Sequence, residues 1–121
     1  MSVAKEFAFH PVGNTVLLAS DPTAPAGIQA PKSDPEGANN HADCYQFYNA
    51  GSETVHIGYG KDATEATANS VIPTGTGASA TKSYPLPAGA VIVMRFGLST
   101  FFSGINASTG GSVFITPGEG L

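Results

Sequence analysis

The feature that most constrains this chain is the absence of any long segment that fits an amphipathic helix. Every window of about a dozen residues with apolar side chains at helical spacing is interrupted by Gly or Pro. The 15 Gly and 9 Pro among 121 residues divide the sequence into short segments, several of them rich in β-branched and aromatic residues, as strands are. This pattern predicts an all-β fold. The predicted strands are 15–19, 44–48, 54–58, 90–96, 100–103 and 112–116.

The spacing of these segments predicts an antiparallel β-sandwich, jelly-roll-like, in one domain over residues 1–121. The last three segments follow one another at intervals of roughly ten residues, and the Gly-rich turns between them are typical of connections between antiparallel neighbours. Alternation along 44–48 and 54–58 assigns one face of each strand to the interior. The predicted core side chains are Tyr45, Phe47, Val55 and Ile57.

Two segments depart from simple strand alternation. The run 90–94 is continuously apolar, which predicts a central strand covered on both faces, either by the domain's own layers or by a partner. Segment 62–69 is the helix candidate, because Asp62 offers a capping side chain. Its brevity and its threonines favour a non-helical turn.

Three further segments are predicted to lie outside the main strands. Residues 1–12, which contain Phe7 and Phe9, form either a first strand over the domain's own core or an arm docked on a neighbouring subunit. Residues 21–43 contain four prolines and little apolar bulk. Because proline cannot join a central ladder, we expect a long surface loop there, of the kind that often serves interaction. The Gly/Ser/Thr-rich residues 73–82 predict a flexible connector.

Composition excludes several classes of protein. Five Lys and Arg against nine Asp and Glu give a net charge of −4 and no basic stripe, so we expect no nucleic-acid partner. The apolar stretches are far shorter than the roughly 20 residues that span a bilayer, and the N-terminal residues lack the apolar core of a signal peptide. We therefore expect no membrane partner and no export. With one cysteine and few large apolar residues, self-association or a partner surface is expected to add stability.

No arrangement of polar residues predicts catalysis. His41, Asp43 and Cys44 come nearest to a ligand cluster, but a closed zinc site needs four ligands at recognisable spacing and no second pair follows. Cys44 is therefore interpreted as a small buried thiol. The Gly-x-Gly patterns at 58–60 and 75–77 lack the further residues of a phosphate-binding loop. We expect no enzymatic activity, no cofactor and no metal.

Low charge and unplaced aromatic residues predict a surface that is covered by protein in use. Adjacent strand residues point to opposite faces, so at most one of Phe101 and Phe102 enters a given core, and the other meets a second layer, solvent or a partner. Only 12% of the residues are charged, which favours protein contact over a fully solvated surface. The predicted partner-interface residues are Phe7, Phe9, Pro31, Pro35 and Phe101.

The C-terminal part of the chain carries a recognisable pattern. Residues 84–94 place Pro-Ala-Gly before an apolar strand, 99–105 form a strand with small residues, and 111–121 end in Thr-Pro-Gly-Glu-Gly-Leu. Residues 47–55 are similar to a strand-Asn-x-Gly-strand hairpin. Together these motifs resemble small virion proteins of tailed bacteriophages. The resemblance implies a capsid decoration (cement) protein that is made in the host cytoplasm. It would bind the outside of the major capsid protein shell, stabilise that shell, and form a homo-oligomer on the virion surface.

Two other interpretations stay open. A tail, collar or head-fibre component would use the same sandwich and the same terminal motif. A carbohydrate-binding β-sandwich would need exposed aromatic residues along a groove with acids beside them. The tyrosines that the sequence offers for this role are Tyr45, Tyr48, Tyr59 and Tyr84.

Overall fold

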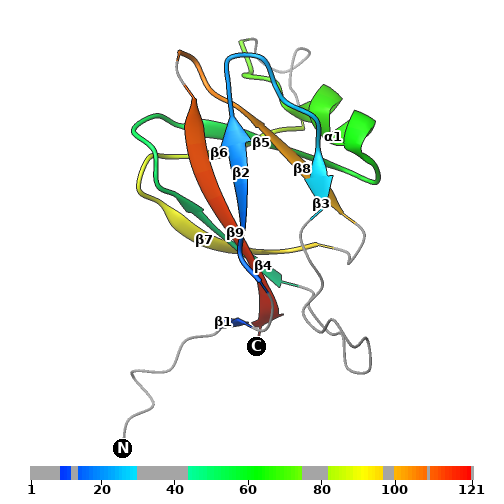
Figure 1. Cartoon of the computed structure of the whole chain (residues 1–121), viewed down its shortest axis with the longest axis vertical. Helices are drawn as coiled ribbons and strands as arrows, with labels where there is room; N and C mark the ends of the chain where they lie inside the picture. The colour runs from blue at the N-terminus through cyan, green and yellow to red at the C-terminus, as the bar shows by residue number, and fades with distance from the viewer. Residues whose placement is uncertain are drawn as a thin grey trace, which may run out of the picture.

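The computed structural model describes residues 9–11, 14–29, 44–74, 82–96, 100–108 and 110–120. These residues form two antiparallel β-sheets and one short helix (Figure 1), which confirms the all-β sandwich. The elements are β1 (Phe9–Pro11), β2 (Val16–Ser20), β3 (Ile28–Gln29), β4 (Cys44–Asn49), β5 (Val55–Gly60), α1 (Ala63–Asn69), β6 (Tyr84–Leu86), β7 (Val91–Arg95), β8 (Phe101–Ile105) and β9 (Gly111–Gly120).

The strands of the first half of the chain pair antiparallel with those of the second half in reverse order, as in one long β-hairpin. Sheet A has the order β1-β9-β4-β7, with β2 also paired to β9, and sheet B has the order β3-β8-β5-β6. The pairs β2–β9, β3–β8, β4–β7 and β5–β6 nest within one another around the connection from β5 to β6, which contains α1. Rolling this hairpin up also brings β4 beside β9 and β5 beside β8.

The core lies between the two sheets and contains every side chain that alternation assigned to it. The ring of Phe102 from sheet B meets Tyr45 and Phe47 from sheet A edge-on, with centroids 5.4 and 5.3 Å apart. Such pairs add about 0.5–1.5 kcal/mol beyond the area they bury. The buried cluster comprises Leu18, Tyr45, Phe47, Val55, Ile57, Leu86, Phe102, Val113 and Ile115.

The expected turn at 62–69 is wrong, because these residues form the helix α1. Asp62 is its N-cap and accepts a hydrogen bond from the backbone nitrogen of Glu65 at 2.8 Å. The Glu65 carboxylate in turn accepts from the backbone nitrogen of Lys61 at 2.8 Å. This reciprocal capping, together with packing on sheet B, outweighs the low intrinsic propensity of the segment.

The expected pairing between the last three strands is also wrong. β7 pairs with β4, β8 pairs with β3 and β5, and β9 pairs with β1, β2 and β4. The connections between β7, β8 and β9 therefore cross between the sheets. Gly, Ser and Asn suit a sheet-to-sheet crossing as well as a hairpin, since both need a tight exposed turn.

The segment 47–55 is likewise a crossing and not a hairpin, because β4 and β5 belong to different sheets. The side chain of Asn49 fixes this crossing. Its Nδ2 donates to the carbonyl oxygens of Glu53 and Leu86 at 2.8 Å each, and its Oδ1 accepts from the backbone nitrogen of Gly51 at 2.9 Å. Asn49 is fully buried and so links sheet A to β6 in sheet B.

The strand predicted to be central, β7, lies at the edge of sheet A. Its only partner among the described strands is β4. Ile92 and Met94 pack against the core, whereas Val91, Val93 and Arg95 are exposed on the other face. The expectation of a central strand is therefore wrong, and no described element lies over the outer face of β7.

Part of the predicted surface loop 21–43 is a packed segment. Ile28–Gln29 forms β3 at the edge of sheet B. The carbonyl oxygen of Pro25 accepts hydrogen bonds from Thr67 Oγ1 of α1 at 2.9 Å and from Ser103 Oγ of β8 at 2.7 Å. These bonds tie the segment to the helix and to sheet B. Residues 30–43 lie outside the described residues.

Candidate protein-binding face

The outer face of sheet B is covered by α1, which Figure 1 shows beyond β8 on the side away from β7. Glycines make this close packing possible. A Cβ atom added at Gly58 of β5 would collide with Ser70 and would lie 2.6 Å from the carbonyl oxygen of Ala66. A Cβ added at Gly27 would lie 2.9 Å from the Cβ of Ala66. Among the described residues, helix α1 and segment 24–27 thus form an outer layer on sheet B.

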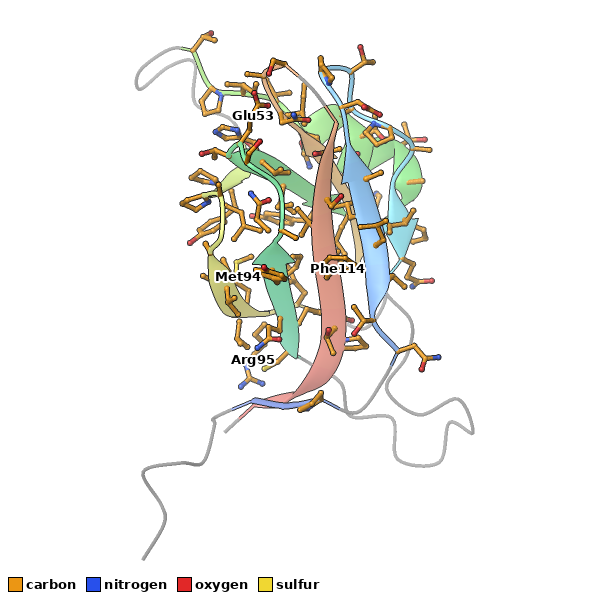
Figure 2. The ribbon with its side chains drawn as sticks, turned by 60° about the vertical axis from the view of Figure 1, so that its left-hand side comes forward. Glu53, Met94, Arg95 and Phe114 are labelled. Atoms are coloured by element: carbon orange, nitrogen blue, oxygen red, sulfur yellow. The ribbon has the colours of Figure 1, made fainter. Side chains whose placement is uncertain are left out.

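The outer face of sheet A has no such layer among the described residues. Four apolar side chains form one row across its strands, because Leu17 is opposite Phe114, Phe114 is opposite Tyr48, and Tyr48 is opposite Val91. Their exposed fractions are 53%, 37%, 42% and 53% in that order. The rings of Tyr48 and Phe114 are stacked with centroids 6.3 Å apart. Figure 2 shows Phe114 midway along β9, in the centre of this sheet.

The next row across the same face is uncharged. Thr15 and Thr116 share a hydrogen bond of 2.7 Å between their hydroxyl oxygens. Thr116 is opposite Gln46, and Gln46 is opposite Val93, which is 43% exposed. Arg95, at the end of β7, is the one charged side chain on β2, β4, β7 and the part of β9 whose side chains are described.

An exposed apolar row on an otherwise neutral sheet face is typical of a protein–protein contact. Water solvates such a face poorly. Each apolar side chain that a partner covers contributes about 25 cal/mol to the free energy of binding for every Å² of its surface that is removed from water. The chemistry of this face therefore suits binding to a flat, largely uncharged protein surface.

Of the predicted interface residues, the structure describes Phe9 and Phe101, and neither belongs to the apolar row of this face. Phe7, Pro31 and Pro35 lie outside the described residues. Phe9 belongs to β1, where it is opposite Gly120 of the domain's own β9. Phe101 is half-buried on the outer side of sheet B, opposite Gly60 and Gln29, while Phe102 enters the core.

The sequence does contain a signal for the outer face of sheet A, although the sequence analysis did not use it. Leu17 and Phe114 alternate with buried Leu18 and with buried Val113 and Ile115, so each strand carries bulky apolar side chains on both faces. Such a strand needs a second covering layer. For β2 and β9 that layer is absent from the described part of the chain.

The residues considered for chemistry do not assemble into a site. Cys44 is buried at the start of β4, as expected for a structural thiol, and His41 and Asp43 lie outside the described residues. The described ranges contain no group of three or more His, Cys, Asp or Glu side chains that could hold a metal ion. They also contain no helix that is long and apolar enough to cross a membrane.

Comparisons with protein-family models, with curated proteins and with solved structures find no match to this chain.

His56 gives the fold a predicted dependence on pH. It lies on sheet B opposite Pro85 and Ile105, and burial lowers its pKa from the ordinary value of 6.5. The unfolded chain thus binds a proton at a higher pH than the folded chain, so stability should fall as the pH drops below about 6.5. Urea unfolding of the wild type and His56→Gln between about pH 7.5 and 5 measures this effect. We expect a shallower loss in His56→Gln, and equal losses in both proteins would contradict the assignment.

Proposed function

We propose that this chain is a structural virion protein of the decoration type, which binds the outside of an assembled major capsid protein shell and stabilises it. The observation that carries the proposal is the exposed row Leu17, Phe114, Tyr48 and Val91 on a sheet face whose one described charge is that of Arg95. A surface of this kind favours binding to other protein.

The resemblance of residues 43–121 to small virion proteins of tailed bacteriophages supports the same proposal. The nested strand pairs β2–β9, β3–β8, β4–β7 and β5–β6 support a jelly roll, an architecture that recurs in viral capsid proteins. This architecture also occurs in proteins with other functions, so the sheet A face remains the main argument.

The energetics of the chain fit a protein that works in an assembly. A partner that binds only the folded state stabilises it by mass action, so a small core suffices on the shell. Copies arranged around a symmetric shell gain further affinity from repeated contacts. Once one contact has formed, the effective concentration for the next is high, so the contacts reinforce one another. On this basis the protein would act at the capsid surface as many copies, each facing the shell with sheet A.

The direct experiment adds the purified chain to capsid shells that lack it. Binding should saturate at a fixed number of copies per shell and should raise the temperature at which the shell loses its integrity. Purified tail tubes serve as the matched comparison, because a tail or collar component would bind them instead. Binding to tail tubes without binding to shells would overturn the proposal.

A further inference from the structure

β7 is an edge strand of sheet A, paired with β4 and with no other described strand. In Figure 1 it forms the side of the molecule that lies away from α1. An edge strand presents a row of backbone N–H and C=O groups that can pair with a strand of another chain. Folded proteins commonly block such edges with proline, with charge or by keeping the strand very short. The edges that this sandwich leaves unblocked therefore indicate where a further strand can add.

The other described edges of the two sheets are short or interrupted. β1 and β6 have three residues each and contain Pro11 and Pro85. β3 has two residues. β2 has five residues, but Asp21 directly after it bridges to Ile105 of sheet B, so this edge ends in a carboxylate and a crossing. β7 has five residues without proline, and the run 90–94 carries no charge. It is thus the least protected edge in the part of the chain that the structure describes.

The backbone of Val91 and Val93 points away from β4. Residues of an antiparallel pair alternate between positions that exchange hydrogen bonds with the neighbouring strand and positions whose backbone groups face the other way. The backbone nitrogen of Asn49 donates to the carbonyl oxygen of Ala90 at 3.0 Å, so Ile92, two residues further on, is the next bonded position. Val91 and Val93 alternate with these positions and present their N–H and C=O groups at the outer edge.

We propose that β7 pairs antiparallel with β7 of a second copy of this chain, about a two-fold axis at Ile92. In this register Val91 and Val93 of one copy exchange backbone hydrogen bonds with Val93 and Val91 of the other. The side chains that meet across the edge on the outer face are all valines, so no like charges lie opposite each other. A two-fold contact needs a self-complementary surface, and an uncharged antiparallel edge is one.

The pairing extends sheet A and leaves its outer face exposed. A two-fold axis perpendicular to a sheet keeps the same face of both copies on one side. The row of Leu17, Phe114, Tyr48 and Val91 would thus occur twice on one continuous surface. The inference goes beyond the proposed shell binding and does not rest on it. A dimer that fails to bind shells would contradict the shell proposal alone, and a monomer that binds them would contradict this inference alone.

Sedimentation equilibrium of the full chain without shells tests the pairing. A pair of five-residue strands buries a small interface, of the size typical of weak and transient association. We therefore expect the mean mass to rise from that of one chain to that of two between about 10 µM and 1 mM protein. Val93→Pro removes an outward N–H group and should weaken the dimer at least tenfold, since proline is tolerated at an edge position. A constant monomer mass in the wild type would overturn the proposal.

Ala19→Pro is the matched control on β2, at the opposite edge of sheet A. Ala19 is opposite Ser112, whose carbonyl oxygen accepts a hydrogen bond from the backbone nitrogen of Ala50, just after β4. The backbone of Ala19 therefore also points outward. This variant should dimerise like the wild type, and thermal unfolding checks that both variants fold. A lost dimer in Ala19→Pro, or an unchanged dimer in a folded Val93→Pro, would overturn the proposal.

Amide exchange in the wild type tests the same edge without a substitution. In nuclear magnetic resonance spectra the amide hydrogens of Val91 and Val93 should exchange with solvent more slowly at high protein concentration than at low, because pairing protects them. The amide hydrogen of Ala19 should exchange at the same rate at both concentrations. Exchange at Val91 and Val93 that does not depend on concentration would contradict the pairing, even if a dimer forms.

Discussion

Phe114→Asp is expected to weaken binding to the capsid shell at least 100-fold while leaving the fold intact. Phe114 lies at the centre of the apolar row, between Leu17 and Tyr48, and its side chain is exposed in the isolated chain. A carboxylate placed there would lose its water in the complex, and the one charged side chain described on this face, Arg95, lies two rows away along the strands. The cost of such an unpaired charge exceeds the roughly 2.8 kcal/mol that corresponds to a 100-fold change in Kd.

The matched control is Val71→Asp. Val71 is 41% exposed and follows α1, so the same charge enters at a similarly exposed apolar position away from the row. Shell binding is measured by co-sedimentation, and thermal unfolding checks that both variants fold. Retained binding in Phe114→Asp, or an equal loss in Val71→Asp, would show that the apolar row is not the interface.

Gly58→Ala is expected to destabilise the chain by about 3 kcal/mol, because the added methyl group meets the end of α1. The atoms it would meet belong to Ser70 and to the backbone carbonyl of Ala66, and a backbone cannot rotate away as a long side chain can. The helix would have to shift off sheet B, which would also strain the hydrogen bond from Thr67 to Pro25. Urea unfolding measures the loss as a lower midpoint.

Gly51→Ala is the control for this variant. At Gly51 the nearest atom to an added Cβ is Asn49 Oδ1 at 3.4 Å, an ordinary contact distance. Its free energy of unfolding should therefore change by less than about 1 kcal/mol. Equal effects of the two substitutions would contradict the close packing of α1 on β5.

The strands could be predicted from the sequence because their signal is local. Each of the six predicted segments overlaps an observed strand, and alternation in 44–48 and 54–58 assigned the core side chains correctly. β3 and β6 were missed, since strands of two and three residues carry too little local pattern, and β6 also contains a proline.

The pairing of the strands could not be predicted in the same way. A turn of Gly, Ser and Asn does not encode whether the next strand joins the same sheet or the opposite one. That choice depends on which strand faces pack against each other when the two sheets form the sandwich. The run 90–94 shows the consequence: its apolar composition indicated cover on both faces, whereas in the chain β7 lies at an edge.

The candidate face was only partly accessible to sequence reasoning. Low charge drew attention to surface that a partner would cover, but the residues chosen lay in the N-terminal segment, in the proline-rich segment and, with Phe101, in β8. Identifying the face requires knowing that α1 covers sheet B. The clue was present in Gly58 and Gly60 on β5, followed directly by the Asp62 and Glu65 cap, because glycines on one face of a strand permit close helix packing.

The central claim is that the outer face of sheet A meets the capsid shell, and a cryo-electron microscopy reconstruction of decorated shells tests it most directly. We expect β2, β9, β4 and β7 to lie against the major capsid protein, with Phe114 buried and α1 turned toward solvent. A reconstruction in which α1 contacts the shell while Leu17, Phe114 and Tyr48 remain exposed would contradict it.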